Sequence, residues 1–228
     1  MEVLQTTDFW IGLVKIIWIN IILSGDNAVV IALAARALPQ RQQRQAVLWG
    51  SGAAVFLRIA LTVVAASLLA LPWLQIVGGV LLLWIGIQLL GEDDEAESGE
   101  VRQHGSLAAA IRTILIADVI MSLDNVIAVA AASQGSTLLL VLGLAISIPL
   151  VIFGATLMVK LMERFPVIVV GGAGLIGWVA GETIVSDAVL AGTFGANRWL
   201  HYAAAALGAA LVIACGKLLQ ARARAKAA

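Results

Sequence analysis

Long apolar runs separated by short polar segments make up almost the whole chain. A helix needs about 20 predominantly apolar residues to cross a hydrocarbon core of about 30 Å. Seven runs reach or approach this length, and they are continuously apolar rather than alternating as lipid-facing strands do. We therefore predict an all-α membrane protein with seven transmembrane helices: Phe9–Leu33, Gln45–Leu71, Leu74–Leu90, Leu107–Ala132, Leu138–Lys160, Val167–Val185 and Leu200–Leu219.

The cations outside these runs predict the orientation. Lysine and arginine concentrate in the cytoplasmic loops of membrane proteins. Here they follow the first, fifth and last runs, whereas the loops on the opposite side contain only Arg198. The chain is thus expected to be N-out/C-in, with its basic C-terminal tail at the lipid headgroups. The cytoplasmic cations are Arg36, Arg41, Arg44, Lys160, Arg164 and the tail from Lys217 to Lys226.

The composition narrows the class of protein. Of 228 residues, 61% are hydrophobic and only 12% are charged, which excludes a water-soluble domain with a polar surface. The formal net charge is zero, so nucleic acid is not an expected partner. Cys215 is the single cysteine, so a bound metal would have oxygen or imidazole ligands rather than thiolates.

A polar motif occurs twice inside the apolar runs. Asn20-Ile-Ile-Leu-Ser-Gly-Asp-Asn27 aligns without a gap with Asp118-Val-Ile-Met-Ser-Leu-Asp-Asn125, and Val77-Gly78-Gly79 is repeated as Val170-Gly171-Gly172. With three helices per unit, the second copy enters the membrane in the opposite direction. This predicts two inverted three-helix repeats and one extra C-terminal helix, an architecture that places transporter sites at the midplane.

The expected organisation has four parts. Residues 1–90 form the first repeat, and residues 91–106 form a cytoplasmic linker that contains six carboxylates. Residues 107–190 form the second repeat, and residues 191–228 form the seventh helix and the basic tail. The linker is too polar to bury a core and is expected to act as a solvated spacer.

The doubled motif carries the candidate chemistry. An aspartate at the centre of a membrane helix costs roughly 2.5–3.5 kcal/mol, so repeated carboxylates need a function. Carboxylate and amide oxygens are ligands for Mn²⁺, Mg²⁺ or Ca²⁺. We predict a metal site made by the polar residues of both copies: Asn20, Asn27, Asn125, Asp26, Asp118 and Asp124.

Further polar residues are expected around this site or as gates. Arg58 lies near the middle of its run, where it is expected to pair with a buried carboxylate and to be displaced by an incoming ion. The others are Ser24, Ser122, Gln88 and Glu182. A straight helix would point positions 118 and 124 about 120° apart, so we also predict breaks at Ser24-Gly25 and at Ser122-Leu123.

The two motifs resemble the paired signatures of TerC-family integral membrane proteins, and the resemblance covers essentially the whole chain. The family is named for tellurium resistance, and its better-supported members resemble Mn²⁺ exporters; some are linked to loading metal into secreted enzymes. The resemblance implies roles for Asp26, Asn27, Asp124 and Asn125, and for Asp118 with its counterpart Asn20.

Together these features predict a multi-pass protein of the inner (plasma) membrane that exports Mn²⁺ through a midplane site. No phosphate-binding loop is present, so a gradient is expected to drive transport, and proton antiport is plausible because a buried carboxylate binds either a proton or a metal. The alternatives are a non-transporting partner that delivers metal to secreted enzymes and an amino-acid or other small-solute exporter. An enzyme is not expected; the partners considered are lipid, the divalent ion, secretion machinery and a second copy of the chain.

Overall fold

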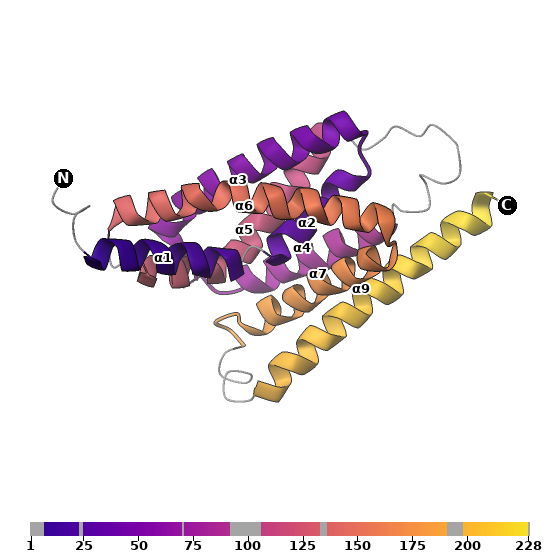
Figure 1. Cartoon of the computed structure of the whole chain (residues 1–228). Coiled ribbons are helices and arrows are strands. Elements are labelled where there is room, and N and C mark those ends of the chain that lie inside the picture. Colours follow the sequence, from indigo (N-terminus) through magenta and orange to yellow (C-terminus); the bar gives the residue numbers. More distant parts are fainter. Residues whose placement is uncertain are drawn as a thin grey trace.

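A computed structural model of the protein describes residues 7–22, 25–69, 71–91, 106–132, 136–190 and 198–227, which form eight α-helices (Figure 1). No strand occurs among these residues, so the all-α prediction is confirmed. The helices are α1 (Thr7–Ile22), α2 (Gly25–Arg36), α3 (Gln40–Leu69), α4 (Leu74–Gly91), α5 (Leu107–Ala132), α6 (Thr137–Arg164), α7 (Val167–Val185) and α9 (Arg198–Ala227).

Five of these helices contain segments long and apolar enough to cross a membrane. The segments are Gln40–Thr62, Leu74–Gly91, Val141–Arg164, Val167–Val185 and Trp199–Ala225, and Phe9–Ile19 is a shorter apolar helix. The chain is therefore a membrane protein with several candidate spans. The count of seven spans and the orientation stay predictions.

The first predicted span is divided into two helices. α1 ends at Ile22 and α2 begins at Gly25, and the predicted break at Ser24-Gly25 falls on residues 23 and 24, which lie outside the described residues. Glycine is a poor helix former, and it is followed by Asp26, whose negative charge is favourable in the first turn of a helix. The backbone N–H of Asn27 donates to the carboxylate of Asp26 over 2.8 Å.

The second predicted break, at Ser122-Leu123, is wrong. α5 runs without interruption from Leu107 to Ala132. Position 123 carries leucine, a good helix former, where the first copy has glycine. Ser122 is satisfied by side-chain hydrogen bonds, so the helix has no need to unwind there.

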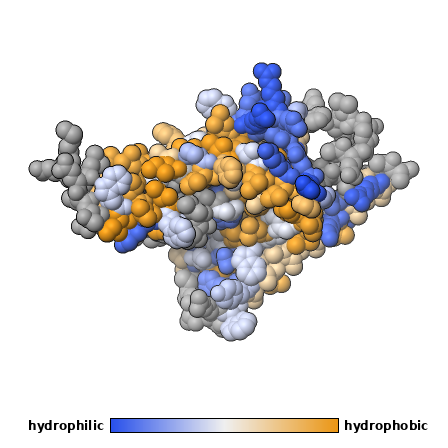
Figure 2. Space-filling view, viewed as in Figure 1, coloured by the Kyte–Doolittle hydropathy of each residue, from blue (hydrophilic) through white to orange (hydrophobic). Residues whose placement is uncertain are grey.

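The ends of the helices gather at two opposite sides of the bundle. Gln43, near the start of α3, donates to Glu163 at the end of α6, and Gln220 of α9 donates to the carbonyl of Leu90 at the end of α4. We call this side the basic end because it carries the exposed residues Arg41, Arg44, Lys160, Arg164, Lys217, Arg222 and Arg224. Figure 2 shows hydrophilic residues gathered where α3 begins and hydrophobic residues over the middle of the same face.

Helix pairs from distant parts of the chain hold the bundle together. α3 packs along α5, and α6 packs along α1 and α2, while α4, α7 and α9 pack closely on one another (Figure 1). α7 and α9 touch through their backbones, because a Cβ atom on Gly177 would clash with the carbonyl oxygen of Gly208. Glycine is needed at such a close approach.

Asp187 joins α7 to α4 at the end of the bundle opposite the basic end. It is fully buried just beyond α7, and its carboxylate accepts backbone hydrogen bonds from Trp73, Gln75 and Ile76 at the start of α4, over 3.1–3.3 Å. The N–H of Val189 donates to it as well, over 2.9 Å. Asp187 therefore caps α4 from the turn that follows α7.

We expect Asp187→Ala to destabilise the protein by about 1–3 kcal/mol, because several buried N–H groups would lose their acceptor. Thermal unfolding in detergent would measure the change. Glu163→Ala, which removes an exposed carboxylate, serves as the control and should change the melting temperature little. Equal melting temperatures for the two variants would contradict the capping role.

The cap also predicts a pH dependence. Burial raises the pKa of the Asp187 carboxyl, but the backbone N–H donors outweigh burial and hold this pKa below its usual value. The stabilisation is therefore complete above the unfolded pKa of about 3.9 and is lost as the pH falls through the lower folded pKa. In acid titrations followed by unfolding, Asp187→Ala should lose less stability than the parent protein over this range.

Candidate functional site: a buried charge network

Arg58, Asp118 and Ser122 form a hydrogen-bonded network between α3 and α5. The guanidinium Nη2 of Arg58 donates to Oδ1 of Asp118, and its Nε donates to the Ser122 hydroxyl over 2.9 Å. The Ser122 hydroxyl donates to Oδ2 of Asp118 over 3.2 Å. The exposed fractions of these residues are 4% for Arg58, 6% for Asp118 and 0% for Ser122. The predicted pairing of Arg58 with a buried carboxylate is confirmed.

The packing of α3 on α5 brings the network together. Asp118 and Ser122 lie one turn apart on α5, so they share the face that meets α3. Two turns before Arg58, Gly50 lets the helices approach: its Cβ position lies 2.8 Å from Ile114 Cδ1, one turn before Asp118. The two helices therefore run side by side in the same direction.

Asp26 brings a second carboxylate to the region of the network. It lies half-buried in the first turn of α2, and it interacts electrostatically with both Arg58 and Asp118. The next residue, Asn27, is buried. The division between α1 and α2 thus places a carboxylate and a buried amide at the N-terminal end of a half-helix, where negative charge is favourable.

The uninterrupted course of α5 separates two of the predicted ligands. Positions 118 and 124 lie about 120° apart around a straight helix axis, so one compact site would not include both. Asn125 is half-buried. The side chains of Asn20 and Asp124, and the whole of Ser24, lie outside the described residues.

Two other predicted residues lie away from the network. Glu182, near the end of α7, accepts a hydrogen bond from the indole Nε1 of Trp178 over 3.0 Å. Gln88 lies at the basic end, where it lines a cavity of about 70 Å³. Thr113 of α5 lines the same cavity, and the sequence analysis did not single it out. The sequence signal that could have identified Thr113 was its position five residues before Asp118 on the same helix.

The described residues do not form a complete metal site by themselves. No cluster of three or more His, Cys, Asp or Glu residues that could hold a metal occurs within the described part of the chain. Asp118 is neutralised by Arg58, which leaves Asp26 as the described carboxylate near the network without an ion-pair partner of its own. The available oxygen atoms of carboxylates and amides suit a hard divalent cation.

We expect Arg58→Met to destabilise the protein by about 3–5 kcal/mol, because a buried carboxylate would lose its counter-charge. Asp118→Asn should also destabilise it. The double variant Arg58→Met/Asp118→Asn should recover much of the loss, since neither charge is left alone. Thermal unfolding of all four proteins in the same detergent gives the coupling, and additive effects of the two substitutions would contradict the ion pair.

Comparison with known proteins gives the family. The sequence model of the Integral membrane protein TerC family matches residues 5–224. The chain is 47% identical over 180 residues to the uncharacterized membrane protein YjbE of Bacillus subtilis, covering 79% of this chain and 82% of that protein.

More distant relatives match in part. The chain is 27% identical to the uncharacterized membrane protein YceF of Bacillus subtilis, covering 63% of this chain and 59% of that protein. It is 30% identical to the UPF0053 inner membrane protein YoaE of Escherichia coli, with 56% of this chain and 28% of that protein covered. No solved structure matches the chain. The protein belongs to the TerC family of integral membrane proteins.

Proposed function

We propose that the protein is a secondary transporter of the inner membrane that exports a divalent cation, above all Mn²⁺, from the cytoplasm. Asp26 and Asp124 would be the central ligands, with Asn27 and Asn125 beside them. The Arg58–Asp118 pair would act as an internal counter-ion next to the site rather than as part of the coordination shell.

The charge balance between the repeated motif and Arg58 is the observation that carries this proposal. The repeated motif contributes three carboxylates, Asp26, Asp118 and Asp124, and the described helices contribute the buried cation Arg58. Three negative charges and one positive charge leave a net charge of −2, which a divalent cation neutralises. Lys15 does not enter this balance, because it is exposed on the surface of α1.

Equivalent packing contacts support the inverted repeat. Gly50 of α3 packs on Ile114 of α5, and Gly143 of α6 packs on Ile16 of α1. Ile16 and Ile114 are 98 positions apart, as are Asp26 and Asp124, and Gly50 and Gly143 are 93 positions apart, as are Val77 and Val170. Each three-helix unit thus packs its second helix on the first helix of the other unit.

The same offsets support separate roles for Asp118 and Asp124. With these offsets, the position equivalent to Arg58 in the second half is Val151, and the position equivalent to Asp118 in the first half is Asn20. The buried ion pair of one half therefore corresponds to two uncharged residues in the other half, whereas Asp26 and Asp124 are present in both. The shared aspartates are the better candidates for a site on the pseudo-two-fold axis.

The helix directions support an alternating path through the membrane. α3 and α5 run in one direction, and α4 meets α7 head to tail, because the start of α4 binds Asp187 beyond the end of α7. The termini lie at opposite ends of the bundle (Figure 1). With the exposed cations at the basic end, the positive-inside rule favours seven spans with the N-terminus outside.

The alternatives differ in what they require of Arg58 and of a purified protein. An amino-acid exporter would need a cation for the substrate carboxylate, but Arg58 already donates to Asp118 and Ser122. A metal-delivery partner would bind Mn²⁺ and give no flux in liposomes that contain this chain alone.

We expect the purified chain in liposomes to carry Mn²⁺, and Asp26→Asn and Asp124→Asn each to reduce flux about 100-fold or more by removing a ligand charge. Glu163→Gln, an exposed carboxylate at the basic end, is the matched control and should keep full flux. Ca²⁺, Mg²⁺ and Zn²⁺ as competitors rank the selectivity. Binding without flux would favour the metal-delivery partner, and unchanged flux in both site variants would overturn the site.

A second test separates a counter-ion from a ligand. Asp118→Asn alone should abolish Mn²⁺ flux, because it leaves the buried Arg58 charge unbalanced. The double variant Arg58→Val/Asp118→Asn copies the uncharged residues of the other half and keeps a net charge of −2 at the site. We expect it to retain flux within about threefold, because neither charge of the pair is left alone. Loss of flux in the double variant would instead make Asp118 a ligand.

A further inference from the structure

The geometry points to a division of the molecule into two groups of helices that move as rigid bodies. The ion would be carried by one body and released at the interface between the two, which we call the seam. This inference rests on the proposed transport function. The site body consists of α1, α2, α3, α5 and α6, and the support body consists of α4, α7 and α9. The two bodies cut across the sequence repeats, since each body takes helices from both halves.

The packing of the helices defines the two bodies. Within the support body, α7 lies against α9 and α4 along most of its length, and α4 also packs on α9. Within the site body, the extensive pairs are α3 with α5 and α6 with α1 and α2. The contacts between the bodies, the most extensive of which are α2 with α7 and α4 with α5, are sparser than these extensive pairs.

Hydrogen bonds reinforce each body internally. Asp187 and Gln220 hold α4 to α7 and α9 at its two ends. Arg58 holds α3 to α5. All described residues of the buried charge network, together with Asp26, Asn27 and Asn125, lie on helices of the site body. The charges would therefore move as one unit, without breaking the buried ion pair.

Beside the charge network, the contacts across the seam are apolar and involve small residues. A Cβ atom on Gly78 of α4 would lie 2.8 Å from Cγ2 of Ile120, which lies between Asp118 and Ser122 on α5. On the other side, a Cβ atom on Gly172 of α7 would lie 2.8 Å from Val29, two residues after Asn27. The repeated Val-Gly-Gly motifs thus place small residues directly beside the helical segments that carry Asp118 and Asn27. Small residues permit close packing without interlocking side chains.

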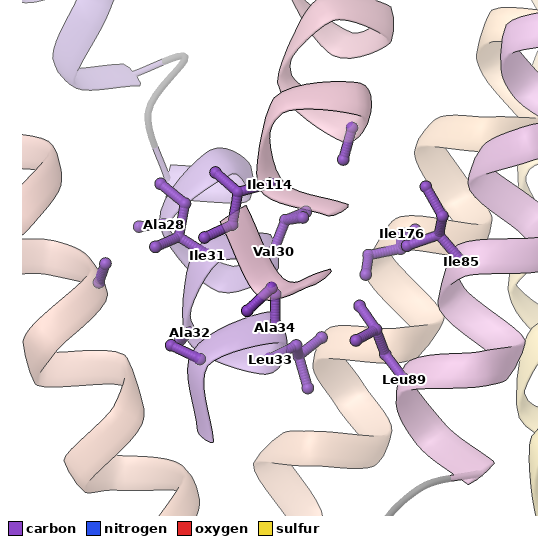
Figure 3. Close-up of a cluster of buried hydrophobic side chains, with 14 of the residues drawn as sticks. Ala28, Val30, Ile31, Ala32, Leu33, Ala34, Ile85, Leu89, Ile114 and Ile176 are labelled. Atoms are coloured by element: carbon purple, nitrogen blue, oxygen red, sulfur yellow. The ribbon is translucent and has the colours of Figure 1, made fainter. Parts of the chain in front are cut away.

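Figure 3 shows the apolar contacts further along this seam. Leu33 of α2 lies on the side of its helix that faces Leu89 of α4 and Ile176 of α7. These contacts are dispersive and non-directional, so they can be exchanged during a sliding or hinge motion. By contrast, the backbone contact of Gly177 with Gly208 belongs to the interior of the support body.

A hollow lies at the basic end of the seam. The cavity of about 70 Å³ is lined by Ala34, Ala37 and Leu38 of α2, by Ile85, Gln88 and Leu89 of α4, and by Ala109, Ala110 and Thr113 of α5. Beside it, Arg36 at the end of α2 donates to the carbonyl oxygen of Leu89 over 3.1 Å and bridges the two bodies. Gln88 and Thr113 bring polar groups to this wall, which suits the cytoplasmic end of an ion path.

The connection between α6 and α7 limits the motion. α6 ends at Arg164 and α7 begins at Val167, so Phe165 and Pro166 alone join the two bodies there. A two-residue connection cannot accommodate a long translation. The bodies would therefore hinge rather than translate, and the seam would open beside α2, α4 and α5.

Disulfide locks test the division in a Cys215→Ser background. In Gly78→Cys/Ile120→Cys the two Cβ positions lie 3.7 Å apart across the seam, and in Gly50→Cys/Ile114→Cys they lie 3.6 Å apart inside the site body. Both separations suit a disulfide. On oxidation, the first pair should lose Mn²⁺ flux about tenfold or more and regain it with reductant, while the second should stay within about twofold of its reduced flux.

The control pair, Gly50→Cys/Ile114→Cys, also distinguishes a motion of the two bodies from a motion of the two sequence repeats. Both disulfide pairs join the first repeat to the second, but only one of them joins the two bodies. If the repeats moved against each other as units, both locks would stop flux, and the two-body division would be wrong. If neither lock stopped flux, the seam would not open in transport, and the inference would fail as well. Absence of flux in the reduced proteins would instead count against the proposed function.

Distances between spin labels test the two-body division without a flux measurement. Exposed positions at the basic end allow one pair across the seam, Arg44→Cys with Leu218→Cys, and one pair inside the site body, Arg44→Cys with Lys160→Cys. In lipid nanodiscs, with and without Mn²⁺ and at two pH values, the first pair should give two distance populations and the second pair one. A single unchanged distance across the seam in every condition would overturn the inference.

Discussion

The buried ion pair between Arg58 and Asp118 is the interaction on which the rest of the structure depends. Both groups are almost completely removed from solvent, and the loss of either partner would leave an unbalanced charge at membrane depth. The pair couples α3 to α5 in one register, and Ser122 completes its hydrogen bonds. With Asp118 neutralised in this way, the proposed transport site would depend on the charge of the two remaining aspartates of the repeated motif.

Much of the fold could be predicted because membrane helices are marked by composition alone. The predicted run Val167–Val185 coincides with α7. The predicted break at Ser122 failed because the argument treated Asp118 and Asp124 as ligands of one site, which required an unwound turn. α5 is continuous and position 118 faces α3, so the pairing of Asp118 requires no unwound turn.

The candidate site was less predictable than the fold. Arg58 was expected to pair with a buried carboxylate. Which of the three aspartates is its partner depends on the packing of α3 along α5, and no local sequence pattern specifies that packing. The capping role of Asp187 could not be predicted, for a similar reason. Its partners at the start of α4 lie more than a hundred residues earlier, and the indirect signal was that Leu71-Pro-Trp-Leu74 contains no residue that caps a helix with its own side chain.

The distance in sequence between Arg58 and its partner has a consequence for biogenesis. Sixty residues separate Arg58 from Asp118, so α3 and α4 are both synthesised before the compensating carboxylate leaves the ribosome. During this interval the nascent chain holds an arginine in or beside the membrane without its permanent partner. The packing of α3 on α5 can therefore be completed only after translation reaches the second half of the protein.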